Sequence, residues 1–134
     1  VFFNISHGGD YVVGVASDCE VGCDIEKNGN APLEVAERHF YLSELVYIRS
    51  AAVKSRAFFT LWTLKECYMK MTGRGLSLPL DSFEVVPQGE GFILGRSVEK
   101  GCFFKTAEFD SHLFSVSREL PFTLDPTDFH EIFL

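Results

Sequence analysis

Hydrophobic and polar residues alternate in the first part of the chain, as they do in strands that bury one face. Two such runs, residues 11–16 and 20–26, are separated by a turn around Ser17 and Asp18. Successive side chains of a strand point to opposite faces, and two strands joined by a short turn commonly pair with each other. The pattern therefore predicts a β-hairpin that covers residues 11–26.

Helical spacing replaces this alternation in the middle of the chain. Pro32 suits the first turn of a helix that reaches about residue 40, and Ser43 is a candidate cap for a second helix. The longest pattern, residues 54–72, repeats apolar side chains at every third or fourth position. It ends at Gly73, a residue that readily adopts the left-handed conformation found just beyond a helix. Three helices are predicted.

Strand patterns return after the helices. Three segments alternate or are apolar throughout, with glycines between them, and they are residues 83–87, 101–109 and 112–118. Residues 121–134 predict an irregular tail with one short helical turn. The order of elements predicts an α+β fold in a single domain, residues 1–134: a β-hairpin followed by three helices and an antiparallel set of strands.

Composition excludes several classes of protein. The net charge of −7 argues against a nucleic-acid binder, which needs a concentrated basic surface. No apolar run approaches the ~20 residues of a membrane helix, so we expect a soluble cytoplasmic protein with no membrane partner. The four cysteines lack the paired spacing of a zinc site, and we interpret them as buried thiols in a reducing compartment.

Charge is distributed unevenly along the chain. Between residues 37 and 56 basic side chains outnumber acidic ones, whereas acidic side chains dominate after Asp110. The basic region is either an ordinary solvated helical surface or a docking face for an acidic partner.

Two carboxylates, Asp24 and Glu26, interrupt the apolar run of residues 21–27. In a strand they share one face, where like charges repel unless both face solvent or a positive group lies between them. In the longest predicted helix Glu66 and Lys70 lie one turn apart. Three carboxylates and a lysine suit a divalent cation bound to a phosphorylated ligand. The alternative is an ordinary exposed Glu–Lys pair on the helix.

A resemblance to a known family rests on three stretches: FNISHGGDYVV, VGCDIEK and FFTLWTLKECYMKMTGRGLSLPLDSFEV. The last two resemble the GxDIE and WxxKExxxK signatures of the Sfp-type 4′-phosphopantetheinyl transferases, and the first resembles the His-containing segment that precedes them. The match covers nearly all of residues 2–86. It implies transfer of the 4′-phosphopantetheine arm of coenzyme A to a serine of an acyl or peptidyl carrier protein, with release of 3′,5′-ADP.

The resemblance also implies a metal centre. Asp24, Glu26 and Glu66 would bind magnesium at the diphosphate of coenzyme A. Lys70 would contact the phosphates. Glu66, or a water that it holds, would be the best candidate to take the proton from the carrier serine.

Three further residues would bind the nucleotide part of coenzyme A. Ser6 and His7 would lie at the nucleotide, with His7 donating to a phosphate. Lys65 would lie near the diphosphate. Without the resemblance, His7 is better explained as a polar residue that caps the turn of the SHGGD segment.

Enzymes of this type are usually roughly twice as long as this chain. They consist of two similar halves with coenzyme A between them, and the chain resembles only the second half. We therefore expect the metal-bearing half of such an enzyme, completed by a missing amino-terminal half or by a second copy of the chain. The alternative is a non-catalytic module that binds a carrier protein or a diphosphate.

Overall fold

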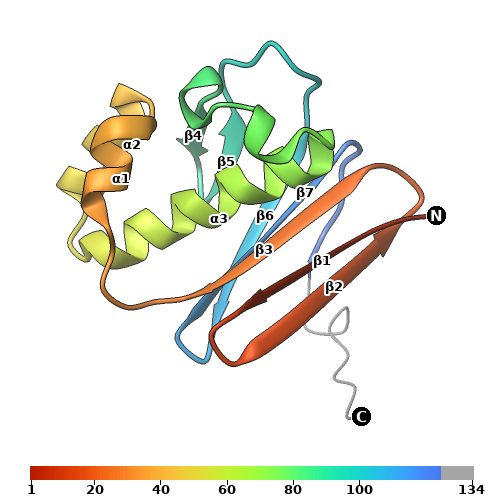
Figure 1. Ribbon diagram of the computed structural model, residues 1–134, viewed down its shortest axis with the longest axis horizontal. Coiled ribbons are helices and arrows are strands. Elements are labelled where there is room, and N and C mark those ends of the chain that lie inside the picture. The colour runs from red at the N-terminus through yellow and green to blue at the C-terminus, as the bar shows by residue number, and fades with distance from the viewer. Residues whose placement is uncertain (125–134) are drawn as a thin grey trace.

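The computed structural model describes residues 1–124, which form an α+β fold with helices on one face of an antiparallel sheet (Figure 1). The helices are α1 (Leu33–His39), α2 (Leu42–Ser50) and α3 (Lys54–Thr72). The strands are β1 (Phe2–Gly8), β2 (Tyr11–Ser17), β3 (Val21–Lys27), β4 (Val85–Gln88), β5 (Gly91–Leu94), β6 (Phe103–Phe109) and β7 (His112–Arg118). The predicted fold class is confirmed. The tail prediction falls mostly on residues 125–134, which lie outside the described part.

The predicted hairpin is wrong in its partners. Strand β2 pairs with β1, and β3 pairs with β7 in a separate five-stranded sheet of order β3-β7-β6-β5-β4. An alternating pattern shows that a strand has a buried face, but it does not show which strand lies beside it. The stronger turn signal was Gly9 followed by Asp10, a two-residue loop between β1 and β2 in which Gly9 has a positive φ of 54°.

Helix α3 packs directly on one face of the five-stranded sheet, across β3 and β7 (Figure 1). The approach is close at Gly22 of β3, where an added Cβ would lie 2.0 Å from the carbonyl oxygen of Cys67. The apolar core above the sheet joins α3 to α2 and to the strands β4 and β6, through residues such as Phe58, Leu61 and Phe104. Gly22 therefore fixes the height of α3 over β3.

The β1–β2 hairpin covers the opposite face of β3 and β7. Its inward residues, including Val13 and Val15, pack on a second apolar cluster that contains Ile25 and Phe114. Strand β1 also runs along the free edge of β3 (Figure 1), where side chains of β1 take the place of a backbone ladder. The N–H of Cys23 donates to Asn4 Oδ1 over 3.0 Å, and the N–H of Ile25 donates to Ser6 Oγ over 3.2 Å.

The ends of the helices follow ordinary capping chemistry. Helix α3 has the predicted limits and ends at Gly73, whose φ is 77°. Helix α2 begins earlier than predicted, because its cap is Tyr41, whose N–H donates to the Glu44 carboxylate over 2.9 Å. Ser43 therefore lies inside α2 and is not its cap. Within residues 1–124 no helix has the length and apolar character needed to cross a membrane.

All four cysteines are free, and three of them (Cys19, Cys23 and Cys67) are buried. Burial raises the pKa of Cys23 to about 11 and that of Cys102 to about 12. The thiols of Cys23 and Cys102 therefore stay protonated at neutral pH and behave as small apolar side chains.

Candidate functional site

The candidate site is centred on Asp24, which β3 holds between β1 and α3. Asp24 is buried, with 4% of its surface exposed. Its Oδ1 accepts hydrogen bonds from Ser6 Oγ and from Lys70 Nζ, each over 3.1 Å. Its Oδ2 is buried and has no hydrogen-bond partner in the described structure. One carboxylate oxygen is thus doubly bonded while the other remains available to a further group.

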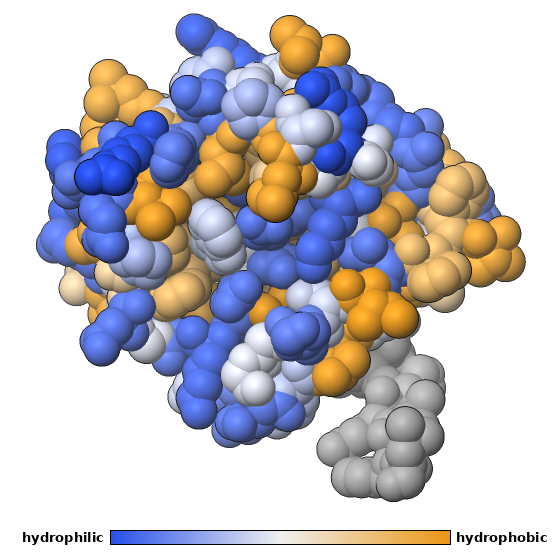
Figure 2. Space-filling model, viewed as in Figure 1, coloured by the Kyte–Doolittle hydropathy of each residue, from blue (hydrophilic) through white to orange (hydrophobic). Residues whose placement is uncertain are grey.

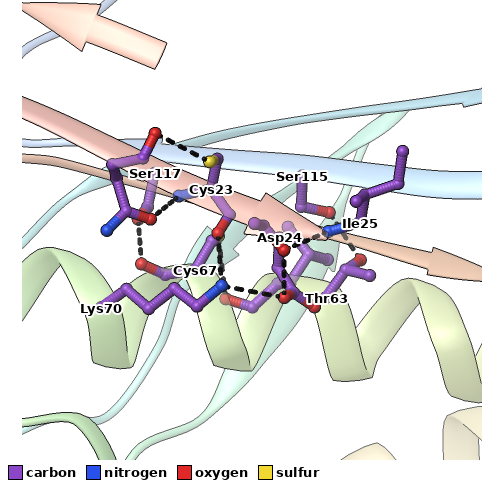
Figure 3. A network of polar contacts seen from close by, with 11 residues as sticks. Cys23, Asp24, Ile25, Thr63, Cys67, Lys70, Ser115 and Ser117 are labelled. Carbon is purple, nitrogen blue, oxygen red and sulfur yellow. Dashed lines mark hydrogen bonds and ion pairs between the residues drawn. The ribbon is translucent and has the colours of Figure 1, made fainter. Parts of the chain in front are cut away.

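Lys70 reaches Asp24 from the last turn of α3. Its Nζ also donates to the carbonyl oxygen of Cys23 over 3.0 Å, so the ammonium is bonded to both the side chain of Asp24 and the backbone of β3 (Figure 3). The Lys70 side chain is 28% exposed. It lies at the boundary between the buried carboxylate and solvent.

Glu26 and Glu66 lie beside this pair and are half-buried. The Trp62 side chain lowers the pKa of Glu26, against the rise that burial causes. The charges of Glu26 and Glu66 act on each other and on Asp24, and Lys70 acts on all three carboxylates. The fold therefore brings strand and helix carboxylates, about forty residues apart in sequence, into one electrostatic group.

Burial is the main influence on these carboxylates. It raises the pKa of Asp24 to about 7, against the opposing effect of Lys70, while Glu26 and Glu66 add to the rise. The pKa values of Glu26 and Glu66 are also raised, again mainly by burial and against the effect of Lys70. The three carboxylates share one lysine, so the positive charge of Lys70 does not balance them when all three are ionised.

A magnesium ion is the group that the sequence resemblance implies here. The donor set fits it chemically, since carboxylate oxygens are its preferred protein ligands and Asp24 Oδ2 is buried without a partner. In residues 1–124, however, no three metal-binding side chains are gathered closely enough to hold an ion as they stand. The predicted shared metal site therefore stays a prediction.

Ser6 and His7, expected at the nucleotide, point to opposite sides of β1. Ser6 is buried, accepting from the N–H of Ile25 and donating to Asp24. Its observed partners are therefore Asp24 and the backbone of β3, and the expected contact with the nucleotide stays a prediction. His7 is exposed, and its charge acts on Glu26, so it remains accessible to a ligand at the edge of the site.

The family resemblance places Lys65 near a diphosphate, but in the structure its side chain lies in the core. The side chain is fully buried and donates to both carboxylate oxygens of Glu44, over 2.8 and 2.9 Å, and to the carbonyl oxygen of Phe83. Lys65 thus faces the core and does not reach the surface on which Asp24 lies. The sequence contained the signal, because Lys65 is four residues after Leu61 and three before Tyr68, which are both fully buried.

The group lies outside two cavities of the described structure. A cavity of about 540 Å³ lies along β5 and β6, and one of about 360 Å³ lies between the α2–α3 junction and the sheet. Neither is lined by Asp24, Glu26, Glu66 or Lys70. The candidate site is therefore a partly exposed edge between β3 and α3.

Comparison with known proteins identifies the relatives of this sequence. Residues 20–124 match the family model described as the 4′-phosphopantetheinyl transferase superfamily. The 4′-phosphopantetheinyl transferase ffp of Bacillus subtilis is 40% identical over 112 residues, which cover 81% of this chain and 50% of the relative. The 4′-phosphopantetheinyl transferase Sfp of Bacillus subtilis strain 168 is 37% identical over 115 residues, with coverage of 81% and 50%.

A human relative, the L-aminoadipate-semialdehyde dehydrogenase-phosphopantetheinyl transferase, is 33% identical over 135 residues, covering 84% of this chain and 43% of the relative. The chain thus spans about half the length of the curated relatives it matches.

Solved structures share the fold at low sequence identity. The holo-[acyl-carrier-protein] synthase of Thermotoga maritima superposes with a TM-score of 0.63 at 18% identity, covering 74% of this chain and 61% of that one. The synthase of Bacillus anthracis, solved in complex with CoA (3′,5′-ADP), gives a TM-score of 0.58 at 17% identity, covering 74% and 93%. At this identity the likeness shows the fold alone.

Proposed function

The chain belongs to the 4′-phosphopantetheinyl transferase superfamily, and from this premise we propose that it transfers the phosphopantetheine arm of coenzyme A to a serine of an acyl or peptidyl carrier protein. The observation that carries the proposal is the group formed by Asp24, Glu26, Glu66 and Lys70, where β3 meets α3. The names of the curated relatives and the coenzyme A bound in one structural neighbour support it.

Asp24, Glu26 and Glu66 are the residues that would hold magnesium. When bound, the ion would supply positive charge that offsets the charge developing on the departing 3′,5′-ADP as the diphosphate bond of coenzyme A breaks. Lys70 binds phosphate oxygens, and exposed His7 donates to a phosphate at the edge of the site. Glu66, the carboxylate carried by the helix, accepts the proton of the carrier serine, directly or through a water molecule.

We further propose that residues 1–134 act as one half of a larger active unit. The outward face of the β1–β2 hairpin is apolar and unpaired by other described segments, with Phe3, Ile5 and Val12 exposed to 72, 60 and 74%. Figure 2 shows hydrophobic side chains over this hairpin. Since the curated relatives are about twice as long, the occupant is an amino-terminal half of the family type or a second copy of the chain.

The carrier protein is proposed to dock on the basic surface around α1 and α2. Arg38, Arg49 and Arg56 are exposed there, with apolar Leu42 between them in sequence and also exposed. Phe40, which lies within this stretch of the sequence, is buried in the core and is not part of the surface. Carrier proteins of this family are typically acidic, so attraction to the arginines speeds encounter. An activity that consumes coenzyme A, together with free thiols, favours the cytoplasm as its compartment.

A second candidate function is a non-catalytic module that binds a carrier protein or a diphosphate. The observation that favours it is that Lys70 already neutralises Asp24, while the described residues contain no gathered metal group. Such a module would bind coenzyme A without transferring its arm.

Transfer of a labelled pantetheine arm in the presence of magnesium separates the two functions. The chain is assayed alone and with the separately produced amino-terminal half of a curated relative, and sedimentation reports its assembly. We expect Glu66→Gln to abolish transfer while keeping the fold, and Glu90→Gln, an exposed glutamate in the turn between β4 and β5, to leave it unchanged. Wild-type turnover by Glu66→Gln would overturn the proposed mechanism. Coenzyme A binding without transfer under every condition would favour the binding module.

A further inference from the structure

Two lysine–carboxylate pairs link α3 to its neighbours. They differ in how completely the carboxylate oxygens are hydrogen-bonded. In the Lys65–Glu44 pair both side chains are fully buried, and both Glu44 oxygens have partners: Lys65 Nζ bonds to each, Tyr41 N to Oε1 and Val85 N to Oε2. This pair has the complete hydrogen bonding that a buried ion pair requires.

The Lys70–Asp24 pair is incomplete by the same measure. Lys70 Nζ and Ser6 Oγ both bond to Oδ1, and Oδ2 is buried without a partner in the described structure. Lys70 is also 28% exposed, whereas Lys65 is fully buried. A flexible lysine stem at the boundary with solvent can move its ammonium away at a much lower cost than a lysine enclosed in the core.

A lysine ammonium and a divalent cation compete for one carboxylate. Both are positive, so they repel strongly at the short separation that shared binding to Asp24 would impose. A diphosphate changes this balance, because its oxygens offer the ammonium another anionic partner. The group that withdraws Lys70 from Asp24 therefore also frees Asp24 for the metal.

We propose that Lys70 is an exchangeable internal counter-ion that couples metal binding to diphosphate binding. In the free chain Lys70 neutralises Asp24 (Figure 3) and weakens metal binding. In the presence of a diphosphate ligand Lys70 transfers to the phosphate oxygens. The two ligands then bind with positive coupling, which by linkage is the same in either order of addition. This inference rests on the proposed function, since it assumes that Asp24 is a metal ligand.

The test measures binding of Mn²⁺, as a probe for magnesium, by electron paramagnetic resonance at about pH 9, where carboxylates are ionised. The variant is Lys70→Met, which keeps the length of the side chain and removes its charge. The matched control is Lys27→Met, which removes the same charge from β3, where Lys27 pairs with Asp10. Coenzyme A is the diphosphate probe, and its own binding of Mn²⁺ is measured without protein and subtracted.

We expect Lys70→Met to bind Mn²⁺ without coenzyme A at least about tenfold more tightly than the wild type and Lys27→Met, within the usual range of such coupling. Coenzyme A should raise the Mn²⁺ affinity of the wild type and of Lys27→Met, but change that of Lys70→Met much less. The comparison of wild type with and without coenzyme A needs no variant, so it remains valid if Lys70→Met does not fold.

Equal Mn²⁺ affinity of wild type and folded Lys70→Met in the absence of coenzyme A would overturn the counter-ion role. A wild-type affinity that coenzyme A leaves unchanged would overturn the coupling. Absence of Mn²⁺ binding by every form, with or without coenzyme A, would instead overturn the proposed metal site itself, and the inference with it.

Discussion

Lys65 Nζ lies 2.8 Å from Glu44 Oε1, and both side chains are fully buried. The pair joins α3 to α2. It also joins both helices to the start of β4, because Lys65 donates to the carbonyl oxygen of Phe83 and the N–H of Val85 donates to Glu44. The next residue in sequence, Glu66, faces the candidate site. The buried pair therefore anchors the helix that carries half of the proposed active residues.

Removing the charge of Lys65 should destabilise the protein strongly. Lys65→Met leaves the Glu44 carboxylate buried without its counter-charge, a change that typically costs about 3–5 kcal/mol. The free energy of unfolding, measured by urea denaturation, checks this. Lys54→Met, at the exposed start of α3, should change it by less than about 0.5 kcal/mol. Equal stability of the two variants would contradict the anchoring role.

Gly22 should be far less tolerant of an added methyl group than another glycine of the same chain. In Gly22→Ala the new Cβ would lie 2.0 Å from the carbonyl oxygen of Cys67, so α3 must move away from β3. We expect the free energy of unfolding to fall by more than about 2 kcal/mol, which is within the range measured for overpacked cores. We also expect Mn²⁺ binding to be lost. Gly29→Ala, with no atom within 4 Å of the new Cβ, should stay close to wild type in unfolding experiments. Stability of Gly22→Ala close to that of the wild type would contradict this prediction.

The metal-free protein should lose stability as the pH rises towards neutrality. The pKa of Asp24 is raised from an ordinary 3.8 to about 7, so the folded state binds this proton more tightly than the unfolded state does. The resulting stabilisation is fully present below about pH 4 and is lost as the pH rises to about 7. Because a tenfold change in proton affinity corresponds to about 1.4 kcal/mol, the stabilisation lost is on the order of a few kcal/mol.

Asp24→Asn removes this dependence. In the presence of a chelator, the free energy of unfolding of the wild type should fall by about 2–3 kcal/mol more than that of Asp24→Asn between pH 5 and pH 8. Urea denaturation at the two pH values measures the difference. An equal fall in both proteins would show that Asp24 does not titrate in this range.

Charge reversal on the proposed docking surface should weaken binding of the carrier protein. Arg49→Glu combined with Arg56→Glu is expected to raise the KM for the carrier protein severalfold and to reduce its salt dependence, with the KM for coenzyme A unchanged. Both arginines are exposed and pair with Glu37 and Glu108, so the fold should tolerate the change. Steady-state kinetics at two salt concentrations test this. An unchanged KM for the carrier protein would show that the carrier protein docks elsewhere.

Local features of the sequence were sufficient where the determining interactions are also local. The limits of α3, the stop at Gly73 and three of the four strands that follow (β4, β6 and β7) depend on propensity, periodicity and backbone freedom within a few residues, whereas the short β5 was not predicted. The candidate group of Asp24, Glu26 and Glu66 was also visible, because a spacing of two on a strand and of four on a helix fixes which side chains share a face.

The environment of each site residue was decided only by the tertiary structure. The sequence placed Ser6 at a nucleotide and Lys65 near a diphosphate, but β1 directs Ser6 onto Asp24, and α2 encloses Lys65 with Glu44.

The sequence by itself determined the family, the fold class and the identity of the charged residues, because these depend on short-range pattern and on chemistry that each residue carries wherever it lies. Only the tertiary structure decided that β3 pairs with β7 rather than β2, that Lys70 neutralises Asp24, and that one oxygen of this carboxylate has no partner in the described residues. These relationships join segments about 50 to 90 residues apart, and their energies depend on burial and distance.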